Sequence, residues 1–78
     1  MEYELINGRR CVVRHFFKID EMRQLEGTTW VPADGMKREV TLGKMLPNED
    51  VEYVDGQGKT WAKDWWHFQV RYCLVKED

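Results

Sequence analysis

Four side chains in this chain are of the types that bind zinc: Cys11, His15, His67 and Cys73. They are expected on extended strands, where residues four apart lie roughly 13 Å from each other and residues six apart roughly 20 Å. A tetrahedral zinc site needs its ligands within about 2.3 Å of one ion. The chain also contains no C-x-x-C pair and no helical H-x-x-x-H pair. The spacing therefore predicts no metal site, and no other cofactor is indicated.

The two cysteines are too few for a disulfide scaffold. Each falls within or beside an expected strand, so we expect both thiols to be reduced, packed and slow to react.

Catalytic motifs are equally sparse. The sequence has no G-x-S-x-G, no phosphate-binding glycine loop and no H-E-x-x-H. The stretch Gly56-Gln57-Gly58-Lys59 is too short for a phosphate loop and lies between two expected strands, so we interpret it as a hairpin turn. His15 and His67 have no identifiable partner for acid–base work. The sequence predicts a protein that is not an enzyme, and an enzyme of unrecognised type is the third hypothesis.

A basic and aromatic set falls on alternate positions of the expected second strand: Arg10, Arg14, Phe16 and Lys18. Residues 5 to 19 contain no acidic residue, although the formal net charge of the chain is −2. Cations for phosphates and a ring for base stacking are typical of a surface for single-stranded DNA or RNA. The alternative is that Glu2 and Glu4 neutralise Arg14 and Arg10 across the first hairpin, which leaves an ordinary solvated face.

A second set, Trp65, His67 and Arg71, shares the odd-numbered face of the expected last strand. An exposed Trp beside an Arg is typical of hot spots between proteins, although a Trp can also lie flat over a core as packing. The leading hypothesis is a non-catalytic interaction domain that binds a protein partner, or a second copy of itself, through an aromatic and basic face. The predicted partner-binding residues are Trp65, His67, Arg71, Arg10, Arg14, Phe16 and Lys18. A single-stranded nucleic-acid binder is the alternative.

The stretch that must position these side chains is the last third of the chain, Trp61 to Val75. Its alternate residues form an apolar row, which predicts a strand with one face on the core: Trp66, Phe68, Val70, Tyr72 and Leu74. A helix is the rival prediction, because Asp64 can cap one and apolar residues also recur at helical spacing. The β-prone composition of the stretch favours the strand.

Near the N-terminus, Asn7-Gly8 predicts a hairpin. A two-residue loop would place Glu4 opposite Cys11, with carboxylates on the apolar face. A three-residue loop with Gly8 in the left-handed conformation would place Tyr3 opposite Cys11 and Glu4 opposite Arg10. The second register keeps the two faces consistent, so it is the one we predict.

Between these ends, the sequence predicts one short helix over residues 20–27 and strands over residues 28–31, 37–42, 51–54 and 59–62. Residues 1–78 are expected to form a single mostly β domain of about five to six short strands and at most one short helix. We expect a small curled antiparallel sheet or an SH3-like or OB-like barrel.

The composition of the chain argues against several classes of function. The 12 basic and 14 acidic residues suggest neither a wholly basic nucleic-acid-binding body nor an acidic mimic of DNA. No apolar run approaches the roughly 20 residues of a membrane span. The start, M-E-Y-E-L, lacks the features of a signal peptide, so we expect a cytoplasmic protein that has no membrane partner. A core of this size is near the lower limit for stability, which would make self-association favourable.

Overall fold

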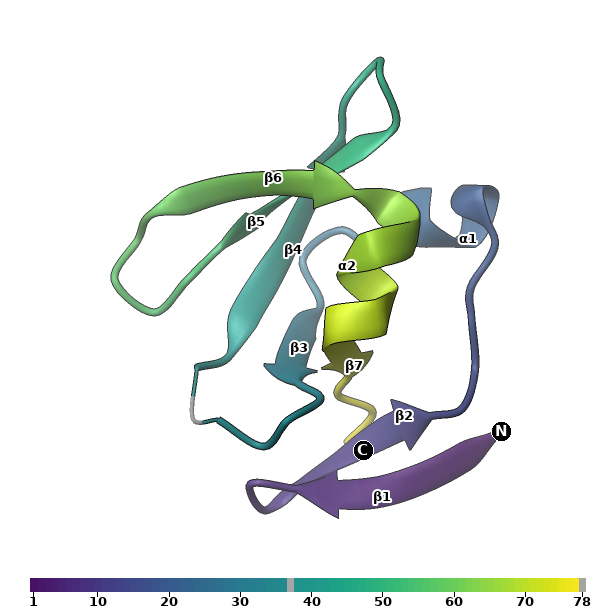
Figure 1. Cartoon of the computed structure of the whole chain (residues 1–78), viewed down its shortest axis with the longest axis vertical. Coiled ribbons are helices and arrows are strands. Elements are labelled where there is room, and N and C mark those ends of the chain that lie inside the picture. Colours follow the sequence, from purple (N-terminus) through teal and green to yellow (C-terminus); the bar gives the residue numbers. More distant parts are fainter. Residues whose placement is uncertain (37, 78) are drawn as a thin grey trace.

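The computed structural model describes residues 1–36 and 38–77. Within these residues it contains seven strands in two antiparallel sheets, together with two helices (Figure 1). The predicted small, mostly β fold is confirmed, with one short helix more than expected. In the described residues no helix is long and apolar enough to cross a membrane.

The first sheet is a hairpin of β1 (Glu2–Ile6) and β2 (Arg9–Val13). Its loop has two residues, Asn7 and Gly8, with φ angles of 54° and 77°. Positive φ at both central positions is the conformation of a type I′ turn. Glu4 therefore lies opposite Cys11, so the predicted three-residue loop with Tyr3 opposite Cys11 was wrong, whereas the positive φ of Gly8 is confirmed.

The exposure of β1 explains this register. All four residues from Glu2 to Leu5 are exposed, so no core covers either face of the strand. A carboxylate at Glu4 consequently remains in water in either register. Because burial favours neither register, the backbone preference of Asn-Gly for a tight turn decides which residues pair.

The remaining elements form the larger part of the molecule. In chain order they are α1 (Ile19–Arg23), β3 (Thr29–Pro32), β4 (Val40–Met45), β5 (Asp50–Val54), β6 (Thr60–Asp64), α2 (Trp65–Arg71) and β7 (Tyr72–Leu74). Their five strands form one sheet in the order β6-β5-β4-β3-β7. The last strand, β7, returns to pair with β3, the first of the five in the chain. The strand predicted over residues 37–42 begins at Val40, and Lys37 lies outside the described residues.

The predicted strand over the last third of the chain was wrong, because α2 occupies Trp65–Arg71 and only Tyr72–Leu74 is extended. Asp64 caps this helix: its Oδ2 accepts hydrogen bonds from the backbone N–H groups of Trp66 and His67, at 3.1 and 3.2 Å. The helix joins β6 to β7, which are the two opposite edges of the sheet. A helix satisfies its backbone hydrogen bonds internally, so it can make this crossing where a strand would lack a partner.

The core lies between α2 and the sheet. Phe68 is fully buried, and its ring centroid lies 5.0 Å from that of Trp30, 5.1 Å from that of Tyr53 and 4.8 Å from that of Tyr72. Apolar residues of β4 and β5 complete the sheet side of the core: Val40, Leu42 and Val51. One side of α2 is thus committed to packing, and its opposite side is left at the surface.

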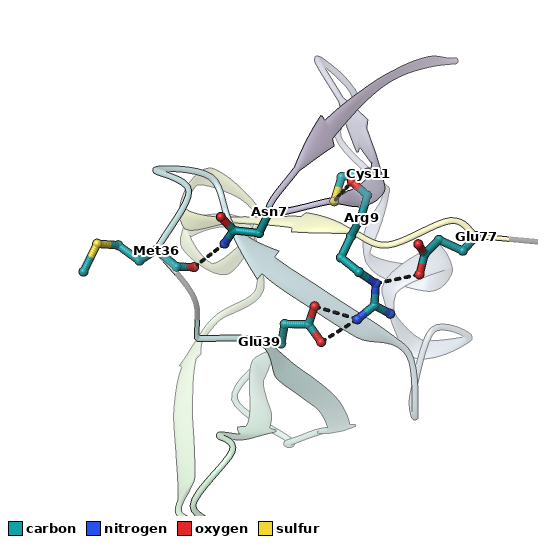
Figure 2. Close-up of polar contacts among 6 residues, drawn as sticks. All are labelled: Asn7, Arg9, Cys11, Met36, Glu39 and Glu77. Carbon is teal, nitrogen blue, oxygen red and sulfur yellow. Dashed lines mark hydrogen bonds and ion pairs between the residues drawn. The ribbon is translucent and has the colours of Figure 1, made fainter.

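Polar contacts attach the hairpin to the larger sheet (Figure 2). The Arg9 guanidinium donates to both Glu39 carboxylate oxygens, at 2.8 and 2.6 Å, and to Glu77 Oε1 at 2.6 Å. Asn7 Nδ2 donates to the carbonyl oxygen of Met36 at 2.9 Å. A short backbone bridge between Cys11 and Val75 continues the pairing from β7 to β2.

Candidate functional site

The segment that follows β2 differs from the prediction. Strand β2 ends at Val13, and Arg14 has a φ of 53°, which turns the chain out of the extended conformation. Arg14, Phe16 and Lys18 therefore lie in the connection between β2 and α1, and they do not share a strand face with Arg10. The basic strand face expected from alternate positions is absent from this part of the chain.

Gln69 holds this connection in place. Its side chain is buried; its Oε1 accepts from the Phe17 backbone N–H at 2.7 Å, and its Nε2 donates to the Phe17 carbonyl oxygen at 3.0 Å. The amide thus pairs with the backbone as a neighbouring strand would. With the Phe17 ring in the core, the adjacent Phe16 side chain is directed to the surface.

Phe16 meets Trp66 on that surface. The two rings are stacked, with centroids 4.4 Å apart and planes 15° apart, and each residue is 46% exposed. Trp66 was predicted to lie in the core row, and that prediction was wrong. Its neighbour Trp65, predicted to point outward, is half-buried and packs against the core.

Val70 extends the exposed pair. It lies one helical turn after Trp66 and is 54% exposed. We call Phe16, Trp66 and Val70 the aromatic surface. A groove of about 220 Å³ opens beside it, with Phe16, Val70 and the half-buried Cys73 among its lining residues. The aromatic surface therefore combines two stacked rings with an adjacent hollow into which a partner side chain could fit.

The predicted basic residues are largely engaged elsewhere. Arg14 Nε contacts Glu2 Oε2 at 2.7 Å, and its NH1 lies 3.7 Å from Glu4 Oε1. The pKa of Arg14 is raised, first by the hydrogen bond to Glu2 and then by the carboxylate charges. The guanidinium of Arg10 lies 4.0 Å from the centroid of the Tyr3 ring. Cross-strand neutralisation, foreseen as the alternative, thus applies to Arg14.

The other predicted binding residues occupy three separate places. Lys18 precedes α1, and its backbone N–H donates to Glu21 Oε1 at 2.8 Å. His67 is exposed on α2, with Nδ1 3.1 Å from Asp64 Oδ2. Arg71 ends α2 and lines a second pocket. Of the predicted set, the structure therefore places Phe16 in the aromatic surface, Trp65 edge-on to Trp66 with ring centroids 6.0 Å apart, and Arg14 in the lining of the adjacent groove.

The zinc-type side chains do not converge. The His15 ring packs edge-on against Phe17 with centroids 4.6 Å apart, and both cysteines are free thiols. Burial is the main cause that raises the pKa of both thiols. Across residues 1–36 and 38–77, no group of three or more His, Cys, Asp or Glu side chains is arranged to hold a metal ion.

Sequence reasoning missed Trp66, Val70 and Gln69. The rival helical prediction contained the signal, because residues four apart share a helix face and Trp66 and Val70 are then neighbours. Gln69 had no comparable signal, since its partner Phe17 is 52 residues away in the chain.

Comparison of the chain with protein-family models, with curated proteins and with solved structures gave no match.

Proposed function

We propose that this domain is a non-catalytic interaction module that binds a protein partner through the aromatic surface. The observation that carries the proposal is the stacked Phe16–Trp66 pair, in which two large rings are held together and left about half exposed. Trp is enriched in hot spots, and a partner that covers both rings would bury substantial apolar area.

The pair is held in position before any partner arrives. Trp66 belongs to a capped helix, and Phe16 is fixed by the two hydrogen bonds between Gln69 and Phe17. Side chains that are already ordered lose little conformational entropy when a partner binds, so more of the burial energy contributes to affinity.

Charge favours a protein partner over single-stranded nucleic acid. The nearest arginine in the connection, Arg14, is paired with Glu2, and one face of the Phe16 ring is covered by Trp66. A base-stacking platform needs open ring faces and cations available for phosphates. Here Trp66 reduces the open ring area of Phe16, and Glu2 reduces the availability of Arg14 for phosphates.

The test is a selection of binding peptides from a displayed random library on the wild-type domain, followed by calorimetry on the selected peptides. We expect Trp66→Ala and Phe16→Ala each to weaken binding by about thirtyfold, which corresponds to about 2 kcal/mol. Leu5→Ala is the matched control, because Leu5 is an apolar side chain that is 76% exposed on β1. It should bind the peptides as the wild type does.

Equal affinity of the wild type and Trp66→Ala for the selected peptides would overturn the proposal. A salt-sensitive titration with an oligothymidylate that is lost in Trp66→Ala would assign the surface to nucleic acid instead. Sedimentation equilibrium at several concentrations tests whether the partner is a second copy, in which case Trp66→Ala should shift the protein toward the monomer.

A further inference from the structure

A second pocket is lined by none of the three residues of the aromatic surface, although Tyr72 lines both this pocket and the groove beside that surface. It has a volume of about 290 Å³ and is lined by residues of the β3–β4 connection, β5, β6 and the end of α2. Trp61, which is 44% exposed, and the half-buried Tyr72 contribute aromatic rings to it. Two arginines and two aspartates also line it: Arg38, Arg71, Asp34 and Asp55.

The two aspartates are engaged in holding their own turns. Asp34 Oδ1 accepts from the Met36 backbone N–H at 3.0 Å. Asp55 Oδ1 accepts from the backbone N–H groups of Gln57 and Lys59, at 2.9 and 3.0 Å. Asp55 Oδ2 accepts from the indole N–H of Trp61 at 3.0 Å, and this bond is the main cause that lowers the pKa of Asp55.

The two arginines differ from the other arginines whose ion pairs are seen. Arg9, Arg14 and Arg23 each contact a carboxylate, at 2.6, 2.7 and 2.8 Å. Within residues 1–36 and 38–77, the side chains of Arg38 and Arg71 form no such ion pair or hydrogen bond. The lining of this pocket therefore combines two aromatic residues with two arginines whose guanidinium groups have no anionic partner among the described residues.

We infer that this pocket binds a carboxylate that is attached to an apolar or aromatic group. A guanidinium matches a carboxylate with two parallel hydrogen bonds, and the rings of Trp61 and Tyr72 offer contact to the adjoining apolar group. The carboxylate can be that of a peptide or of a small organic acid, because the chemistry is the same. A nucleic-acid strand fits less well, since it would bring several phosphates to a lining that holds two arginines and two aspartates, whereas a single carboxylate needs only one guanidinium.

The test follows the side-chain N–H signals of Arg38, Arg71 and Trp61 by NMR while probes are added. The first probe is 3-phenylpropionate, with its neutral amide as the control. The second is a tetrapeptide ending in phenylalanine, with either a free or an amidated C-terminus. At about millimolar concentration we expect the two free acids to shift these signals and to bind at least tenfold more tightly than the amides.

The two acids distinguish the sources of the ligand. Tighter binding of the peptide acid would assign the pocket to a peptide terminus, and equal binding would assign it to small organic acids. Arg71→Gln should weaken either acid at least tenfold, whereas Arg23→Gln on α1 should not. Binding that is the same for acids and amides, or that survives Arg71→Gln, would overturn the inference. So would a preference of the pocket for oligothymidylate over both acids.

This site is independent of the proposed function. Trp66→Ala removes the aromatic surface and should leave binding of 3-phenylpropionate unchanged. Arg71→Gln should leave the selected peptides of the aromatic surface bound, so failure of one proposal is distinguishable from failure of the other.

Discussion

At the scale of single residues, backbone conformation sets the register of the β1–β2 hairpin, because burial favours neither register. The loop of the β1–β2 hairpin adopts positive φ at Asn7 and Gly8 because an Asn-Gly pair tolerates that conformation best. A Cβ built on Gly8 meets nothing within 4 Å, so the constraint there is conformational and not steric. Glycine is favoured at this position because of its φ alone.

Gly8→Ala should therefore lower the free energy of unfolding by about 1 kcal/mol, since an L-residue pays that cost in the left-handed region. Gly56→Ala is the matched control, because Gly56 also has open space around its Cβ position but lacks a positive φ. It should be neutral or slightly stabilising. Urea denaturation measures both variants, and equal effects would contradict the conformational argument.

The two thiols should differ in reactivity. Cys11 is fully buried in β2, and Cys73 is half-buried beside the aromatic surface, so a thiol reagent should label Cys73 first. The pKa of each is raised above its ordinary value of 9.0, mainly by burial. Because the thiolate is the reactive form, each thiol should label more slowly than an ordinary cysteine at the same pH, and its labelling should continue to accelerate up to a pH above that value.

The raised pKa of the two thiols also determines how the stability of the fold changes with pH. The folded protein holds these thiol protons more tightly than the unfolded chain, so the free energy of unfolding should fall as the pH rises above the ordinary thiol pKa. Mass spectrometry of protein labelled between neutral and alkaline pH tests whether Cys73 reacts before Cys11. Labelling of Cys11 at the rate of the urea-unfolded chain would contradict it.

At the scale of elements, one side-chain amide joins two segments that carry the candidate site. Gln69 on α2 holds the backbone of Phe17, and the Phe16 ring is thereby placed against Trp66. Neither segment alone presents the stacked pair. The aromatic surface is a property of the contact between α2 and the connection that follows β2.

Gln69→Leu keeps a similar volume but leaves the N–H and carbonyl oxygen of Phe17 buried and without these partners. We expect a loss of about 2 kcal/mol in the free energy of unfolding, together with faster hydrogen exchange at the Phe17 amide. Gln57→Leu is the control, because Gln57 is exposed and, among the described residues, its side chain forms no hydrogen bond while its backbone N–H donates to Asp55. An unchanged exchange rate at Phe17 in Gln69→Leu would contradict the proposed role.

At the scale of the whole molecule, α2 separates a buried side from an exposed one. Phe68 is enclosed by the rings of Trp30, Tyr53 and Tyr72, whereas Trp66 lies at the surface against Phe16. On a strand these two residues would share one face, and their replacement would have similar effects. On the observed helix their roles are different.

Phe68→Ala should cost about 3–5 kcal/mol, which can unfold most of a domain this small. Trp66→Ala should cost about 1 kcal/mol, mainly the stacking with Phe16. Thermal and urea denaturation of the two variants measure the difference. Similar losses for both variants would favour the strand over the helix and would remove the aromatic surface together with it.

The sequence alone determined the class of the fold and many of its elements. The hairpin at Asn7-Gly8, the short helix α1 and the strands β3 and β5 follow from turn residues and alternation, which are local signals that act within a few residues. The count of charges and the small size of the chain also follow directly from composition.

Only the tertiary structure decided the state of Trp65–Arg71 and hence the site. Its composition favours a strand, but the helix joins opposite edges of the sheet and buries Phe68 against Trp30 and Tyr53 of distant strands and against nearby Tyr72. Which tryptophan faces solvent depends on contacts between segments far apart in the chain, since Trp66 lies against Phe16. Tertiary packing outweighed local propensity here because one buried aromatic residue contributes several times the energy of a residue's intrinsic preference.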